Sequence, residues 1–174
     1  MKALFLAAAL TLAGVAAAPA ADVYTLMAKR LAVMEDVAAW KHAAGKPVED
    51  KEREAVVLDT AVKNAQAEGI EEAGARVFFR SMIEAAKDIQ TCEIARWEAG
   101  EATPPAEPED LNAEIRPQLI ILGRQILGSI RRSLEAGEAL SDRSAFDEAM
   151  AVDCLSPARA DGMYDALGGL RFSG

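Results

Sequence analysis

Two basic residues, Arg30 and Lys41, occupy positions in the sequence where apolar residues are expected. The apolar residues around them follow the three-and-four spacing that is typical of the buried face of a helix. At ~100° per residue, Arg30 falls within about 20° of the centre of that face, and Lys41 falls almost on it. Because a buried cation is costly without a counter-charge, the pattern predicts an anion close to both side chains.

Further polar residues lie on or beside the apolar faces of later segments, namely Arg53, Gln90 and Arg116. A buried amide must be hydrogen-bonded, and buried cations must be paired. For any single residue, an internal ion pair or a side chain that reaches the surface is the simpler explanation. For four inward cations and an amide together, the chain offers too few inward carboxylates. The set therefore favours a bound ligand with at least two negative charges.

The elements that must position these residues are all predicted to be helices. Long helices are expected over residues 23–44, 49–69, 71–98 and 111–136, and shorter ones from Ser144 and from a Ser156 cap followed by Pro157. Residues 100–110 contain three prolines and are expected to form a linker. We therefore expect an all-α fold, a bundle of about six helices in which three long helices form the site. One domain over residues 21–174 would comprise a catalytic-helix region (23–99), the linker and the C-terminal helices (111–174).

Composition and charge exclude several classes of protein. The chain has 174 residues and a formal net charge of −9, which argues against nucleic acid as a partner. It contains one His and two Cys, too few for a convincing zinc site, so we expect no metal. No glycine pattern of a nucleotide-binding loop is present.

Residues 1–20 have the features of a secretory signal peptide. A basic residue at position 2 precedes an apolar run from Ala3 to Ala18, and a small-residue site follows. The alternative is a membrane anchor, but the run is Ala-rich and shorter than the roughly 20 residues that a span needs. We expect cleavage after Ala20 or Ala21, a periplasmic or secreted location, and no membrane contact after cleavage. In an oxidising compartment Cys92 and Cys154 are expected to form a disulfide.

The spaced set of Arg30, Lys41, Asp50, Arg53 and Glu54, followed by Gln90, resembles the all-helical chorismate mutases. The resemblance is carried by KRLAVMEDVAAWKHAAGKPVEDKERE and FFRSMIEAAKDIQ, between about Leu26 and Gln90. The leader and the long C-terminal half resemble the secreted, periplasmic (gamma) subclass. The resemblance implies the rearrangement of chorismate to prephenate without a cofactor, a metal or a covalent intermediate, and it suggests a homodimer.

The resemblance also implies a role for each site residue. Arg30 and Arg53 would bind substrate carboxylates, and Arg116 would supply a further cation. Lys41 and Gln90 would hydrogen-bond the ether oxygen, where negative charge develops as the carbon–oxygen bond breaks. For the remaining positions, Asp50 and Glu54 would address the ring hydroxyl and orient the cations. Ala86 stands where relatives often carry a Ser or Thr that touches a carboxylate, so that contact would be lost or made by the backbone.

A second hypothesis from another class is a periplasmic helical binding or interaction protein that keeps the fold but has lost catalysis. Ala86 and Val57 favour it, because they replace polar contacts found in relatives. The intact set of Arg30, Lys41 and Gln90 favours the enzyme.

Overall fold

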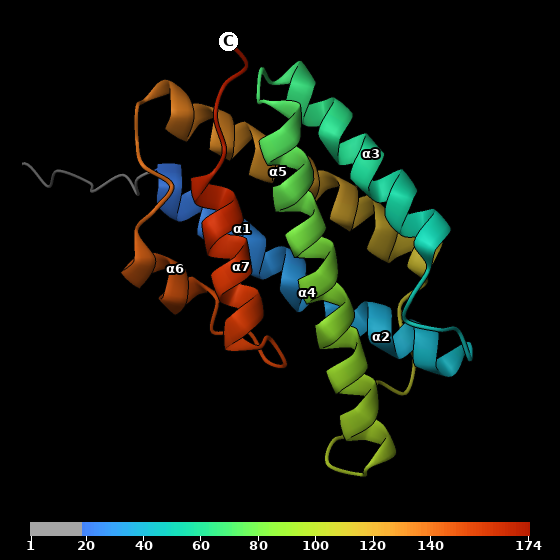
Figure 1. The fold of residues 1–174 in the computed structure, drawn as a ribbon. Coiled ribbons are helices and arrows are strands. Elements are labelled where there is room, and N and C mark those ends of the chain that lie inside the picture. Colours follow the sequence, from blue (N-terminus) through green and yellow to red (C-terminus); the bar gives the residue numbers. More distant parts are fainter. Residues whose placement is uncertain (1–18) are drawn as a thin grey trace, which may run out of the picture.

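The computed structural model of the chain describes residues 19–174, except for the side chains of Pro19 and Ala21. The expected leader lies almost wholly outside the described residues. Within them the fold is all-helical, as predicted (Figure 1). The helices are α1 (Pro19–Ala32), α2 (Met34–Ala43), α3 (Lys51–Ala67), α4 (Glu72–Glu98), a π-helical turn η1 (Leu111–Ile115), α5 (Arg116–Glu135), α6 (Arg143–Ala149) and α7 (Pro157–Gly168). If α1 and α2 are counted as one helix, and η1 is counted with α5, the described residues form six helices, as expected.

The first helix differs from the prediction of one element over 23–44. It begins at Pro19, and a one-residue turn at Val33 divides it into α1 and α2. Val33 has ψ −11°, away from the helical value near −42°, and its N–H lies 3.4 Å from the Lys29 carbonyl. The turn contains neither proline nor glycine, so the sequence pattern could not reveal it.

Two aspartates, Asp50 and Asp110, cap the N-termini of α3 and η1. Asp50 caps α3 by accepting a hydrogen bond from the Arg53 N–H at 3.0 Å, and Glu54 accepts one from the Asp50 N–H at 3.2 Å. Such reciprocal caps satisfy N–H groups that have no partner within the helix. Asp110 caps η1 through the N–H groups of the second and third residues that follow it.

The predicted helix from Leu111 to Ala136 is also corrected at its start. Its first five residues form the π-helical turn η1, and the α-helix begins at Arg116. Pro117 explains the change, because it has no N–H to bond the carbonyl four residues back.

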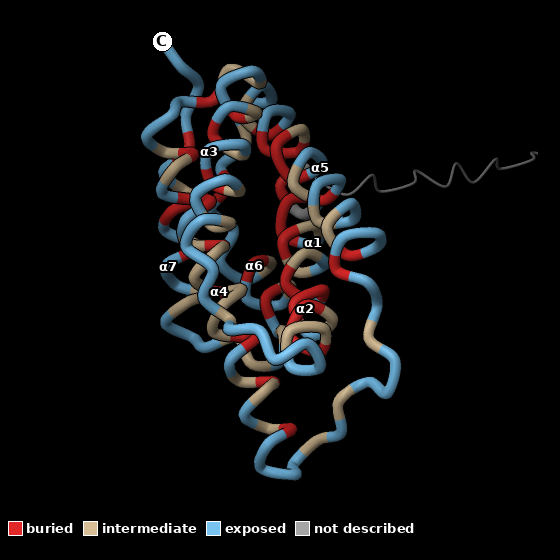
Figure 2. The backbone as a smooth tube through the Cα atoms, turned by 90° about the vertical axis from the view of Figure 1, so that its right-hand side faces the viewer, coloured by how far each residue is buried: buried red, intermediate tan, exposed pale blue. Residues whose placement is uncertain are grey.

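The core lies between α1, α4 and α5, and α3, α6 and α7 cover its sides. Figure 2 shows the buried positions along the sides of the helices that face the interior. Tyr24, Phe78 and Phe146 are among its largest fully buried side chains, and Tyr24 meets Phe146 edge to face at 5.5 Å. Burial of such side chains contributes about 1.5–3 kcal/mol each, which holds the helices bordering the site in place.

A disulfide ties the C-terminal part of the chain to α4. Cys92 on α4 is bonded to Cys154, which lies between α6 and α7, 62 residues further along the chain. The predicted disulfide is therefore confirmed. None of the helices within residues 19–174 is long and apolar enough to cross a membrane.

Candidate active site

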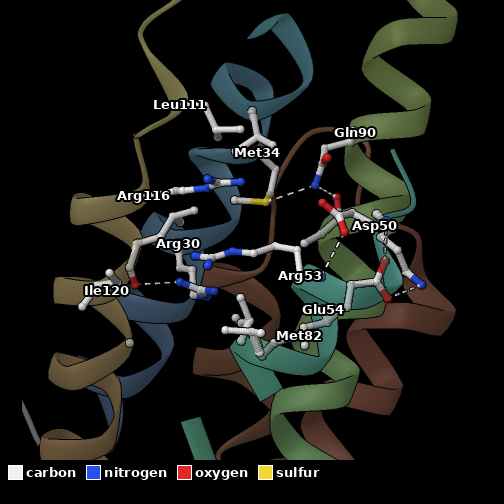
Figure 3. A pocket seen from close by; sticks show the side chains of 18 of the residues that line it. Arg30, Met34, Asp50, Arg53, Glu54, Met82, Gln90, Leu111, Arg116 and Ile120 are labelled. Atoms are coloured by element: carbon white, nitrogen blue, oxygen red, sulfur yellow. Dashed lines mark hydrogen bonds and ion pairs between the residues drawn. The ribbon is translucent and has the colours of Figure 1, made fainter. Parts of the chain in front are cut away.

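A cavity of about 750 Å³ opens between α1, α2, α3, α4 and the start of α5 (Figure 3). This volume is within the range of sites for small organic molecules. All eight residues that the sequence singles out line it: Arg30, Lys41, Asp50, Arg53, Glu54, Ala86, Gln90 and Arg116. Five helices, α1 to α5, thus bring together residues that lie up to 86 positions apart in the sequence.

The charge of the cavity is opposite to that of the chain. Seven cationic and three acidic side chains line it, whereas the chain as a whole carries a formal net charge of −9. Besides the predicted cations, the lining includes Lys46, Lys87 and Arg124. Such a local excess attracts an anionic ligand and concentrates it at the cavity.

Arg30 faces the cavity without a carboxylate partner among the described residues. Its Nη1 donates a hydrogen bond of 2.8 Å to the Leu119 carbonyl on α5. Part of the side chain remains accessible because it borders the open cavity, yet the guanidinium lies deep among protein atoms. Burial lowers the pKa of Arg30 from its usual value to about 10, so the group stays protonated at neutral pH.

Lys41 reaches the cavity from α2. Its Nζ donates a hydrogen bond of 2.6 Å to the Val48 carbonyl, in the loop between α2 and α3. Burial lowers the pKa of the Lys41 ammonium. The negative charges of Asp50 and Glu54 oppose this change and the positive charge of Arg116 adds to it, so that the pKa lies below the usual value of 10.5. Because none of the described carboxylates comes within 4.0 Å of Nζ, the ammonium keeps its charge available to a ligand.

Arg53 and Arg116 complete the cationic wall from α3 and α5. Figure 3 shows their guanidinium groups extending toward the same space as that of Arg30. Arg116 donates a hydrogen bond from Nη1 to the Oδ1 of Asn112. The described residues provide no ion pair for either arginine. Guanidinium groups so placed suit the bidentate binding of carboxylates.

Gln90 is buried, with 5% of its surface exposed, and lies opposite the arginines. Its Nε2 donates to the Ala86 carbonyl at 3.0 Å and to the Met34 Sδ at 3.6 Å. Its Oε1 has no partner among the described residues. Ala86 thus contributes a backbone carbonyl that orients this amide, and the unsatisfied Oε1, an acceptor, is suited to a hydrogen-bond donor on a polar ligand.

Asp50 and Glu54 are the acidic side of the cavity. Both carboxylates belong to the reciprocal cap of α3, and the Oε2 of Glu54 also lies 3.1 Å from the Nζ of Lys87. The sequence pattern does not mark Lys87 as a site residue, because it lies beside the apolar face of α4 and resembles a solvated residue. The Val48 carbonyl was missed as well, since no side-chain pattern marks a backbone acceptor in a loop.

The helical bundle and its cation-lined cavity are those of a protein suited to bind a small anionic molecule. Residues 21–91 match the family model described as chorismate mutase type II. A chorismate mutase of known structure from Burkholderia thailandensis is 31% identical, with a TM-score of 0.70, and the match covers 87% of this chain and 98% of that one. The chain belongs to the chorismate mutase type II family.

Two further relatives are similar over different lengths. A monofunctional chorismate mutase from Enterobacter agglomerans is 35% identical over 63% of this chain, and the chain spans 59% of the length of that relative. A secreted chorismate mutase from Yersinia pestis is 26% identical over 82% of this chain and 76% of its own. The crystal structure of that secreted enzyme has a TM-score of 0.80 at 24% identity and covers 87% of this chain and 98% of that one.

Proposed function

We propose that this chain is an exported chorismate mutase that rearranges chorismate to prephenate. The observation that carries the proposal is the group of cavity cations, Arg30, Lys41, Arg53 and Arg116, that have no carboxylate partner among the described residues. Chorismate carries two carboxylates, so its binding would supply the missing counter-charges. Family membership makes chorismate the first substrate to test.

The rearrangement is unimolecular, so the protein must orient the substrate and stabilise developing charge. Guanidinium groups of Arg30, Arg53 and Arg116 would hold the carboxylates, so that the enolpyruvyl arm lies over the ring. Such orientation removes much of the entropic part of the barrier. No proton transfer is needed, and the residues of the cavity include no histidine.

Lys41 and Gln90 would stabilise the ether oxygen as the carbon–oxygen bond breaks. The Val48 carbonyl holds the Lys41 ammonium, and the Ala86 carbonyl holds one N–H of the Gln90 amide, so both side chains are oriented before the substrate arrives. The second N–H of Gln90, 3.6 Å from the Met34 sulfur as measured from Nε2, would exchange that weak acceptor for the ether oxygen. Preorganised donors of this kind are usually the largest single contribution to catalysis. Asp50 and Glu54 would address the ring hydroxyl and orient the neighbouring cations.

Export is supported by three observations of different kinds. The first 20 residues have the composition of a signal peptide, the chain forms the Cys92–Cys154 disulfide, and one relative is named a secreted chorismate mutase. We also propose that the mature chain, residues 21–174, is one domain and forms a homodimer. Sedimentation of that chain would test the oligomeric state, and a monomer would contradict the dimer.

The experiment for the activity follows the disappearance of chorismate absorbance with purified residues 21–174. We expect a rate far above the uncatalysed background, and prephenate as the product. A rate equal to the background would reject the enzyme and favour a binding protein that has kept the fold.

A further inference from the structure

Lys87 is a cavity lysine to which the proposed reaction assigns no role. It follows Ala86 on α4 and also lines a neighbouring groove of about 430 Å³ between α3 and α4. Its side chain is 21% exposed. A partly buried lysine between two cavities needs a reason for its position, because desolvation of an ammonium is unfavourable.

The contacts of Lys87 are with two carboxylates. Its Nζ lies 3.1 Å from the Glu54 Oε2 on α3 and 2.9 Å from the Glu84 Oε1 on its own helix. Glu54 is 24% exposed, so this pair is shielded from solvent much better than the ion pairs on the outer surface. Burial disfavours the ammonium, but the hydrogen bonds to Glu84 and Glu54 outweigh this effect and raise the pKa of Lys87.

Both oxygens of Glu54 are therefore occupied. The Oε1 accepts a hydrogen bond of 3.2 Å from the Asp50 N–H, and the Oε2 faces Lys87. Glu54 also acts on Lys41 through space, since its charge raises the pKa of that lysine, but it forms no ion pair with it within 4.0 Å. Two lysines thus face one carboxylate, and only Lys87 is in contact with it.

We propose that Lys87 is a positioning residue that holds the Glu54 carboxylate against α4 and so keeps it from pairing with Lys41. Without Lys87, the Oε2 of Glu54 would be free to turn toward Lys41, which lines the same cavity and already feels the charge of this carboxylate. A direct Glu54–Lys41 pair would neutralise the charge that Lys41 presents to the cavity. Lys87 thereby preserves the Lys41 ammonium for an anionic ligand.

The first test measures the pKa of Lys41 by NMR of its labelled side chain and does not depend on the proposed function. The groups that face Lys41 are Asp50 and Glu54 from α3 and Arg116 from α5. In Lys87→Met, we expect the pKa of Lys41 to rise by about one pH unit, as an opposite charge moves into contact. Lys87→Arg should keep the wild-type value, because a guanidinium can still hold Glu54.

A matched control removes the same charge from a different helix, at the exposed Lys63 on α3. Lys63→Met should leave the pKa of Lys41 unchanged. An unchanged pKa in Lys87→Met would overturn the proposal. Circular dichroism checks that each variant is folded, and Lys87→Gln replaces Lys87→Met if the latter is not.

The second test is kinetic and rests on the proposed chorismate mutase activity. Lys87→Met should lower kcat for chorismate about tenfold, with a smaller change in KM, because charge at the transition state is affected most. Lys87→Arg should restore most of the rate.

A double-mutant cycle with Glu54→Gln then decides whether Lys87 acts through Glu54. In the Glu54→Gln background, Lys87→Met should have no further effect. If the reductions in kcat caused by Lys87→Met and by Glu54→Gln multiply in the double variant, Lys87 acts independently of Glu54, and the proposal is overturned. An inactive wild type would reject the proposed function alone, since the NMR test would still report on the role of Lys87.

Discussion

Cations on the outer surface of this protein differ in kind from cations in its cavity. On the surface, Arg143 contacts Asp147 and Asp161 at 2.7 Å each, and Arg159 contacts Asp88 at 2.6 Å. These hydrogen bonds raise the pKa of both arginines. In the cavity, burial lowers the pKa of Arg30, which has no carboxylate partner among the described residues.

The difference separates cations that belong to structural ion pairs from cations that are available to a ligand. Exposed pairs are inexpensive to form and contribute about 0–1 kcal/mol each, so their loss matters little. Unpaired cations in a buried cavity reduce stability, and they persist when a bound anion compensates for them. An acidic chain that gathers seven cationic side chains around one cavity therefore indicates an anionic ligand rather than a structural ion-pair network.

The largest expected effect comes from removing the Lys41 ammonium. Lys41→Ala should lower kcat/KM for chorismate by about 10²–10³, the usual result of losing one preorganised donor at a developing negative charge. Steady-state kinetics measures the loss, and circular dichroism should show an unchanged helical content. Lys63→Ala, at an exposed position on α3, is the matched control and should keep the wild-type rate. Equal rates for the two variants would remove the role assigned to Lys41.

Removal of the disulfide is expected to affect the stability of the fold and not the binding of substrate. Replacing Cys92 and Cys154 with serine opens a link between residues 62 positions apart and should lower the free energy of unfolding by about 3 kcal/mol. Below the melting temperature, KM for chorismate should change by less than about twofold, because neither cysteine lines the cavity. Denaturant unfolding and kinetics test both points, and an unchanged stability would show that the bond does not support the fold.

Arg30 and Arg159 give the most direct contrast between the two regions. Arg30→Met should raise the free energy of unfolding by about 1 kcal/mol, since it removes a desolvated and unpaired charge. It should also lower kcat/KM about tenfold or more, through the loss of a carboxylate contact. Arg159→Met should lower stability by less than about 1 kcal/mol and leave kinetics unchanged. If Arg30→Met destabilised the fold as a core substitution does, the buried charge would be structural.

The pH dependence of the rate tests the choice of an amide at position 90. Gln90 donates at any pH, so activity should be steady from mildly acidic to neutral pH. It should then fall as the pH rises through the lowered pKa of Lys41, because only the ammonium stabilises negative charge. In Gln90→Glu, a protonated carboxyl is needed, and turnover should be confined to acidic pH. A wild-type rate that drops steeply between mildly acidic and neutral pH would contradict this assignment.

The sequence predicts the site better than it predicts the shapes of the helices. Arg30, Lys41 and Gln90 could be found because a charge or an amide inside an apolar helical face breaks a strict periodicity. The turn at Val33 could not, because local hydrogen-bond geometry and packing produce it. The π-helical turn before Arg116 could not either, because Pro117 is equally compatible with an ordinary helix start.

Lys87 shows the limit of the same reasoning. Its partner Glu54 lies 33 residues earlier, on another helix, so only the packing of α3 against α4 reveals the pair. The disulfide was predictable, because the chain has two cysteines and an expected location in an oxidising compartment. The sequence did not reveal how the segment between α6 and α7 brings Cys154 to Cys92.

The proposed site is tested most directly by a crystal structure with an unreactive dicarboxylate analogue of the chorismate transition state. We expect its carboxylates to lie on the guanidinium groups of Arg30, Arg53 and Arg116. We also expect its ether oxygen to lie within hydrogen-bond distance of the Lys41 Nζ and the Gln90 side-chain amide. An analogue bound outside this cavity, or bound within it with its carboxylates away from all three arginines, would show that these cations are not the substrate site.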